Sequence, residues 1–206
     1  MPMTTLYDQA PRITMRDPLA DFLGATDDGL LTYRYLDAVR LAGHSCPTVA
    51  SAFLMTRAAL AALYPDSVPE RGALHAELSA ARTDGVCGVI ASVVTLLTGA
   101  TGDGGFKGIG GRFDRRQSLH FGTGAADTLQ LRRTDTGAAV GVSARLDRVP
   151  AAPDGSTLMQ RALSPTASPA ELAAFRRSWQ DRVRRLLLEH ADDPAVFVVR
   201  PLDPPA

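Results

Sequence analysis

The sequence predicts an α+β fold, because strong helix signals and strand signals are both present along the chain. The segment 86–97 carries no charged residue, which indicates a helix buried on all sides and packed against a sheet. The segments 128–134 and 138–146 have the pattern of strands, and Asp135-Thr136-Gly137 between them is typical of a hairpin turn. A length of 206 residues, 45% of them hydrophobic, suits one core domain with additions at its ends.

The N-terminal half is expected to contain an arm followed by two helices. Residues 1–26 contain three prolines and no sustained period, so we expect an arm that wraps the body or a partner. Apolar residues recur at helical spacing from 27 to 41 and predict a helix that ends at Gly43. Pro47 suits the first turn of a second, largely buried helix near 48–63, because the missing N–H needs no partner there.

The C-terminal half is expected to add strands and one long helix. The segments 72–83, 117–121 and 196–199 have strand character, and a glycine-dense loop occupies 99–111. A connection rich in Pro, Ala and Ser leads to Ser168-Pro169-Ala170-Glu171, which is a helix start signal for a helix reaching His190. We therefore divide the chain into an arm (1–26), a core (27–149), and a linker with a C-terminal helix and short strand (150–206).

Charge and cysteine content narrow the classes of function. The chain has 22 basic and 22 acidic residues, so no overall field draws it to nucleic acid or to a membrane, and small molecules or proteins are the expected partners. It has no apolar run of about 20 residues, and charged residues stand where a signal peptide is apolar. We therefore expect a cytoplasmic protein. Two cysteines in that compartment are bystanders, ligands or redox groups instead of a structural disulfide.

Two cysteines each stand at the expected start of a helix. His44 lies two residues before Cys46, and Pro47 then begins the helix. Unpaired N–H groups at a helix N-terminus stabilise a thiolate and lower its pKa. Cys87 repeats the arrangement at the start of the charge-free helix, with Asp84 as the expected N-cap. These positions predict that Cys46 and Cys87 form one site, as ligands or as catalytic groups.

The same residues carry a resemblance to a known family. Gly43-His44-Ser45-Cys46-Pro47 resembles the Gly-His-x-Cys-Pro motif of the FmdE-like family of formylmethanofuran dehydrogenase subunits. The segments 83–88 and 97–102 are similar to that family's acidic-Cys helix start and Leu-Thr-Gly-x-Thr loop, and the hairpin 131–142 is similar to its strand-turn-strand. The resemblance spans about 30–146 and covers the core only, without the C-terminal zinc-finger module of some members.

The resemblance implies a mixed β-sheet flanked by helices, a homodimer, and a transition-metal site formed by His44, Cys46 and Cys87. Two thiolates and one imidazole with an open fourth position are typical of a catalytic or sensing zinc, and they also suit iron, nickel or copper. The chain departs from the family at Thr48, where Gly is usual, and at Ala100, where Cys is frequent. The family's loop lysine is displaced here to Lys107.

Several alternatives remain open from the sequence. His75 or His120 is a possible fourth ligand, although a strand histidine is more often an exposed polar residue. The loop 99–111 does not fit a P-loop and is expected to form a rim over the metal site. Other hypotheses are an enzyme of unspecified reaction, a dithiol/disulfide redox protein without metal, and an accessory subunit whose C-terminal helix docks a larger enzyme.

Overall fold

The computed structural model describes residues 3–203, and this part of the chain contains seven α-helices and two β-sheets, which confirms the predicted α+β class. The helices are α1 (Met3–Gln9), α2 (Pro18–Phe22), α3 (Tyr35–Ala42), α4 (Pro47–Leu63), α5 (Cys87–Thr98), α6 (Gly155–Ala162) and α7 (Pro169–Leu188). The strands are β1 (Ile13–Arg16), β2 (Leu30–Tyr33), β3 (Leu74–Leu78), β4 (Leu119–Phe121), β5 (Leu129–Arg133), β6 (Ala139–Ala144) and β7 (Phe197–Leu202).

The larger sheet is mixed, with the strand order β4-β3-β5-β6-β7. Strands β3 and β4 run parallel and are connected through α5, whereas every other neighbouring pair is antiparallel. The expected hairpin joins β5 to β6. Gly137 adopts a φ of 73° in that turn, a conformation that glycine reaches without strain. Helix α5 is therefore the crossover between β3 and the edge strand β4.

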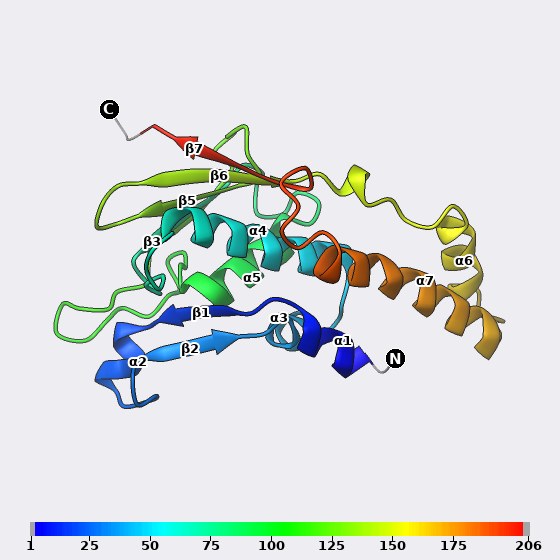
Figure 1. Ribbon diagram of the computed structural model, residues 1–206, viewed down its shortest axis with the longest axis horizontal. Coiled ribbons are helices and arrows are strands. Elements are labelled where there is room, and N and C mark those ends of the chain that lie inside the picture. Colours follow the sequence, from blue (N-terminus) through cyan, green and yellow to red (C-terminus); the bar gives the residue numbers. More distant parts are fainter. Residues whose placement is uncertain (1–2, 204–206) are drawn as a thin grey trace.

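Helices α4 and α5 cover one face of this sheet, while no helix in residues 3–203 covers its other face, which we call the open face (Figure 1). On β3, Leu74, Ala76 and Leu78 are buried beneath the helices, and the residues between them point to the open face. On their other side, α4 and α5 meet α3 and the β1–β2 ribbon (Figure 1). Because α4 lies between these layers, 12 of its 17 residues are buried, as its near-absence of charge predicts.

The predicted arm and first helix differ from the structure. In the arm, α1, β1 and α2 form where no regular element was expected, and residues 1–2 lie outside the described part. The helix predicted over 27–41 is divided between β2 and α3, which begins only at Tyr35. The reason is a nonlocal pairing: β1 is antiparallel to β2, with Ile13 opposite Tyr33, and buries Met15 completely. Local periodicity does not report such a partner.

The C-terminal addition is a helical hairpin followed by a strand. Helix α7 begins with the predicted capping box, in which the Ser168 hydroxyl accepts from the Glu171 N–H. The predicted linker also contains α6, which packs against α7 and with it extends beyond the end of the sheet (Figure 1). Strand β7 then returns to pair with β6 over six residues, longer than the predicted segment 196–199.

A buried ion-pair network centres on Asp17, at the N-terminus of α2. Asp17 is the N-cap of α2 and is 4% exposed. It receives hydrogen bonds from Arg71 at 2.9 Å and from Arg115 at 2.7 Å. Arg71 also donates to the carbonyl oxygen of Leu96 near the end of α5. The network thus connects the N-terminal ribbon to the loops that enter β3 and β4.

No helix in residues 3–203 is both long enough and apolar enough to cross a membrane.

Candidate functional site

The segment from His44 to Pro47 connects α3 to α4. Gly43 ends α3 in the left-handed conformation, with a φ of 73°, and turns the chain toward the next helix. Cys46 is the N-cap of α4, and its sulfur accepts the backbone N–H of Val49 at 3.4 Å. Pro47 occupies the first position of the helix, as predicted. The Cys46 thiol is therefore buried and directed at the N-terminus of α4.

The His44 ring is held in one orientation by the backbone. Its Nδ1 lies 2.9 Å from the carbonyl oxygen of Ala42, and a carbonyl accepts only, so Nδ1 carries the proton. When the ring is neutral, this tautomer leaves the lone pair on Nε2, and the side chain is exposed. A backbone carbonyl that fixes the far nitrogen in this way is typical of histidines that bind metals.

Ser45, between these two residues, is clamped by two helices. Its hydroxyl donates to Gln180 Oε1 at 3.1 Å and lies 3.0 Å from the Tyr35 hydroxyl. Its carbonyl oxygen accepts from Trp179 Nε1 at 3.1 Å and from Gln180 Nε2 at 3.0 Å. Because the single hydroxyl proton of Ser45 goes to Gln180, Tyr35 is the donor in their contact. The C-terminal helix α7 thus determines the position of the motif.

Burial has a direct effect on Tyr35. The phenol is fully buried, and desolvation raises its pKa, with the nearby Cys46 thiol adding to the rise. Tyr35 is therefore a neutral hydrogen-bond donor at physiological pH. Its ring also packs edge-on against Tyr7 and Phe53. These contacts anchor the motif in the hydrophobic core.

Cys87 has a different environment from the predicted one. It is the first residue of α5, is 6% exposed, and donates its thiol proton to the carbonyl oxygen of Ala80 at 3.4 Å. Val86 is the N-cap, whereas Asp84 accepts the Cys87 N–H through its backbone carbonyl. Burial raises the pKa of Cys87, and the Asp84 carboxylate raises it further. The expected side-chain cap and lowered pKa are therefore wrong for this cysteine.

Both cysteines belong to one hydrophobic core, and neither forms a disulfide. They come from helices that pack against each other, so α4 and α5 bring both thiols into the same layer. Across residues 3–203, no three or more His, Cys, Asp or Glu side chains are grouped closely enough to hold a metal ion. The structure thus places His44, Cys46 and Cys87 on neighbouring elements without assembling them into one ligand cluster.

The remaining histidines lie elsewhere. His75 and His120 occupy β3 and β4 on the open face of the sheet, with their rings stacked at 6.5 Å. The helices that carry Cys46 and Cys87 cover the opposite face (Figure 1). His190 follows the end of α7 and lies 2.9 Å from Asp193 through Nδ1. His75 and His120 thus lie on the face of the sheet opposite the helices that carry the cysteines. His190 has Asp193 as its local partner.

The loop 99–111 is anchored at its start and open at its centre. Thr101 donates its backbone N–H to Arg115 O, and Asp103 accepts from Gln117 Nε2. Asp103 lines a surface pocket of about 380 Å³ beside β4, together with Arg82 and His120. That pocket lies against β4 and neither cysteine lines it.

Comparison with models of known protein families finds no match, and a search of curated proteins finds none.

Proposed function

We propose that the chain is an FmdE-like metal-binding protein, in which His44, Cys46 and Cys87 hold one transition metal, with zinc the first choice. The proposal depends most on His44. Its ring is fixed by Ala42 O with Nε2 free, two residues before a thiol that caps a helix. Thiolate and imidazole are preferred ligands of zinc, and iron, nickel and copper accept the same set.

Metal binding requires a local change under this proposal. Cys87 must give up its proton and its hydrogen bond to Ala80 O before its sulfur can ligate. The ligands are not grouped in advance, so we expect metal binding to be coupled to a shift of the segment that leads into α5. A bound zinc ion would supply a Lewis acid with an exchangeable position. Ser45, held by Trp179 and Gln180, fixes the positions of His44 and Cys46 relative to each other.

Elemental analysis by mass spectrometry tests the proposal on protein purified without an affinity metal. We expect about one metal per chain in the wild type, for one three-ligand site. Cys46→Ser and Cys87→Ser should each reduce the metal content to near background. His75→Gln is the matched control and should keep the metal, because His75 lies on the open face of the sheet. Full occupancy in both cysteine variants would refute the assignment.

A dithiol/disulfide redox function is the second candidate, because both cysteines are free and share one core. It predicts a metal-free protein whose mass falls by about 2 Da on mild oxidation, as two thiols lose their hydrogens. Either serine substitution should abolish that mass change, and the wild-type protein distinguishes the two functions. Metal in the wild-type protein together with no mass change excludes the redox function.

We further propose that the protein is a cytoplasmic homodimer, alone or as an accessory subunit of a larger enzyme. Free cysteines fit a reducing compartment. Leu163, between α6 and α7, is 76% exposed, so the hairpin offers apolar surface to a partner outside the residues that line any described pocket. Light scattering at micromolar concentration should give a mass near twice 21.8 kDa. A monomer at that concentration contradicts the dimer.

A further inference from the structure

An apolar pocket lies where the hairpin α6–α7 meets the beginning of α4. Its volume is about 250 Å³. The walls are formed by Met159 of α6, by Phe175 and Trp179 of α7, and by Pro47 of α4. The rings of Phe175 and Trp179 lie 5.6 Å apart and are tilted by 46°, so they present an angled aromatic wall. Concave sites of this kind, with aromatic walls, are typical of small-molecule binding.

The pocket is continuous with the His44–Pro47 motif. Pro47 follows Cys46 directly and lines the pocket. Trp179 also connects the two, because its indole N–H is bound to Ser45 O while the residue forms part of the wall. A molecule in the pocket therefore lies next to the motif without requiring a metal there.

One wall of the pocket carries a positive charge. Arg182 donates from Nε to Val149 O at 2.7 Å and from Nη2 to Leu146 O at 2.8 Å. Both acceptors are neutral carbonyls. Among the described residues no carboxylate forms an ion pair with Arg182, and its remaining nitrogen, Nη1, makes no hydrogen bond to them. The guanidinium is thus held in place with its charge uncompensated and one donor group to spare.

The charged groups near Arg182 favour the binding of an anion in the pocket. Asp181 already pairs with Arg184 and Arg185, and it does not line the pocket. Burial lowers the pKa of Arg182, and the charge of Arg185 lowers it further, so the cationic form lacks its usual solvation. An anion in the pocket would restore that stabilisation through a charge-assisted hydrogen bond.

We propose that this pocket binds a small amphipathic carboxylate, with its apolar body between Met159, Phe175 and Trp179 and its carboxylate on Arg182. The volume lies just below the range of roughly 300–1,000 Å³ found for drug-sized ligands, so a molecule with a single ring or a short alkyl chain fits. The proposal stands independently of the metal, because every contact comes from α4, α6, α7 and the chain before α6.

A titration with 4-phenylbutyrate and its uncharged amide tests this on the full-length, metal-free protein. Trp179 is the only tryptophan in the chain, so its fluorescence reports on the pocket directly, with calorimetry as the second readout. Because one charge-assisted hydrogen bond distinguishes the two probes, we expect the carboxylate to bind at least about tenfold more tightly than the amide. Equal affinity for both probes, or no binding of either, overturns the proposal.

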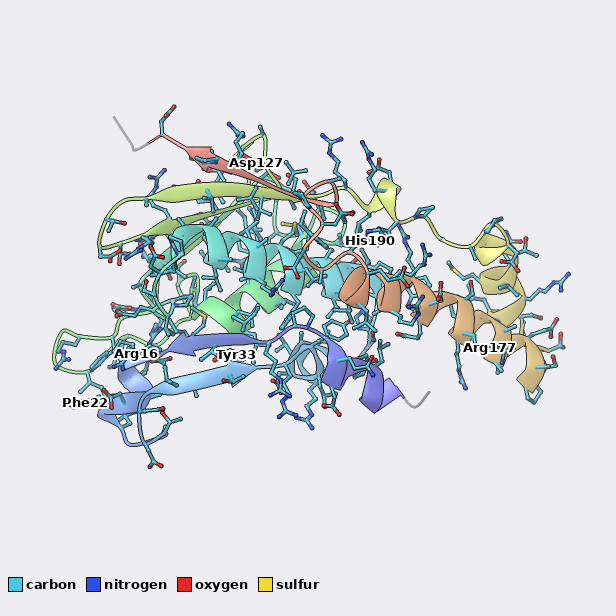
Figure 2. All side chains as sticks on the ribbon, in the orientation of Figure 1. Arg16, Phe22, Tyr33, Asp127, Arg177 and His190 are labelled. Atoms are coloured by element: carbon cyan, nitrogen blue, oxygen red, sulfur yellow. The ribbon has the colours of Figure 1, made fainter. Side chains whose placement is uncertain are left out.

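Three variants locate the site. Arg182→Met should remove the preference for the carboxylate, whereas Arg177→Met should leave it unchanged, because Arg177 lies exposed on the outer part of α7 and does not line the pocket (Figure 2). Ala151→Phe adds a bulky ring at another lining residue, removes neither Arg182 nor its two backbone acceptors, and should weaken both probes. This third variant covers the case in which Arg182→Met does not fold. Unchanged binding in Ala151→Phe contradicts the site.

Discussion

The indole nitrogen of Trp179 donates to the carbonyl oxygen of Ser45 across a separation of 134 residues. Gln180 reinforces this contact, since its amide both donates to Ser45 O and accepts from the Ser45 hydroxyl. Two consecutive residues of α7 therefore hold the centre of the His44–Pro47 motif. The C-terminal helix is part of the candidate site, and it also forms the pocket next to it.

Replacing Trp179 with Phe tests the clamp. Ser45 O keeps its hydrogen bond from Gln180, so we expect a loss of only about 0.5–1.5 kcal/mol in the free energy of unfolding. Replacing Gln180 with Leu in addition should cost more than the sum of the single changes, because Ser45 O then loses both donors. Urea unfolding followed by far-ultraviolet circular dichroism measures this without the tryptophan signal. Strict additivity would show that the two side chains act separately.

The Asp17 network gives a prediction about stability. Asp17→Asn removes the one carboxylate between two guanidinium groups, Arg71 and Arg115, of which Arg115 is 6% exposed. Leaving such charges buried without their partner costs about 3–5 kcal/mol of the free energy of unfolding. Asp114→Asn is the matched control, because Asp114 pairs with Arg116 at the surface, and its loss should change stability little. Equal effects of the two substitutions would contradict the role of burial.

The same network should depend on pH. Burial alone would raise the pKa of Asp17, but the hydrogen bond from Arg71 and the charge of Arg115 outweigh it, and the pKa lies below the ordinary value of 3.8. A lowered pKa in the folded state gives stability that is complete above the unfolded value and is lost as the pH falls through the folded value. The stability difference between wild type and Asp17→Asn should therefore be constant near neutral pH and shrink below 3.8. Unfolding curves measured from pH 7 downward follow the difference, and a gap that grows in acid would contradict the assignment.

Gly72 is expected to tolerate no side chain. Its φ is 90°, and a Cβ atom there would overlap with Arg115 Nη1, so the buried guanidinium would have to move. Gly124 is the matched control, with a φ of 66° and no atom within 4 Å of its Cβ position. Gly124→Ala should cost only the backbone strain of about 1–2 kcal/mol. Gly72→Ala should cost clearly more in the same unfolding assay, and equal losses would show that Arg115 moves aside without effect.

Local sequence patterns predicted the helices whose start or burial is encoded by a few neighbouring residues. The start of α4 at Pro47 and the capping box of α7 follow from single residues, and the charge-free sequence of α5 reflects its burial on both sides. The β1–β2 ribbon escaped prediction because its strands are short and are stabilised by each other. Helix α6 escaped it because it is only eight residues long, none of them is buried, and its main packing partner is α7.

The residues of the candidate site divide in the same way, into those with a local signal and those whose contacts depend on packing. The motif itself identified Cys46 and the helix that it caps, because the cap is formed within four residues. Tyr35 and Gln180 were not identified, since their contacts with Ser45 depend on how α3 and α7 pack. Trp179 left one signal in the sequence, because it recurs at helical spacing with Phe175 and Val183. The raised pKa of Cys87 depends on burial, which the position of a residue along a helix does not report.

The loop 99–111 should be the least protected segment between α5 and β4. Gly104, Gly110 and Gly111 have open space where a side chain would lie, so packing does not hold them. Thr101 differs, because its N–H is bonded to Arg115 O at the anchored base of the loop. We expect hydrogen exchange to be fast at the three glycines, slower at Thr101, and slowest at Val93 and Leu97 in the buried helix α5.

Native-state exchange followed by NMR resolves these amides one by one. If the loop forms a rim over the metal site when metal is bound, zinc should slow exchange at the three glycines while leaving α5 protected throughout. The matched control is the Cys46→Ser variant with the same zinc addition, in which the glycines should continue to exchange fast. Glycines as protected as α5 in the metal-free wild type would show that the loop is fixed in place, and would contradict a segment that opens and closes over the thiols.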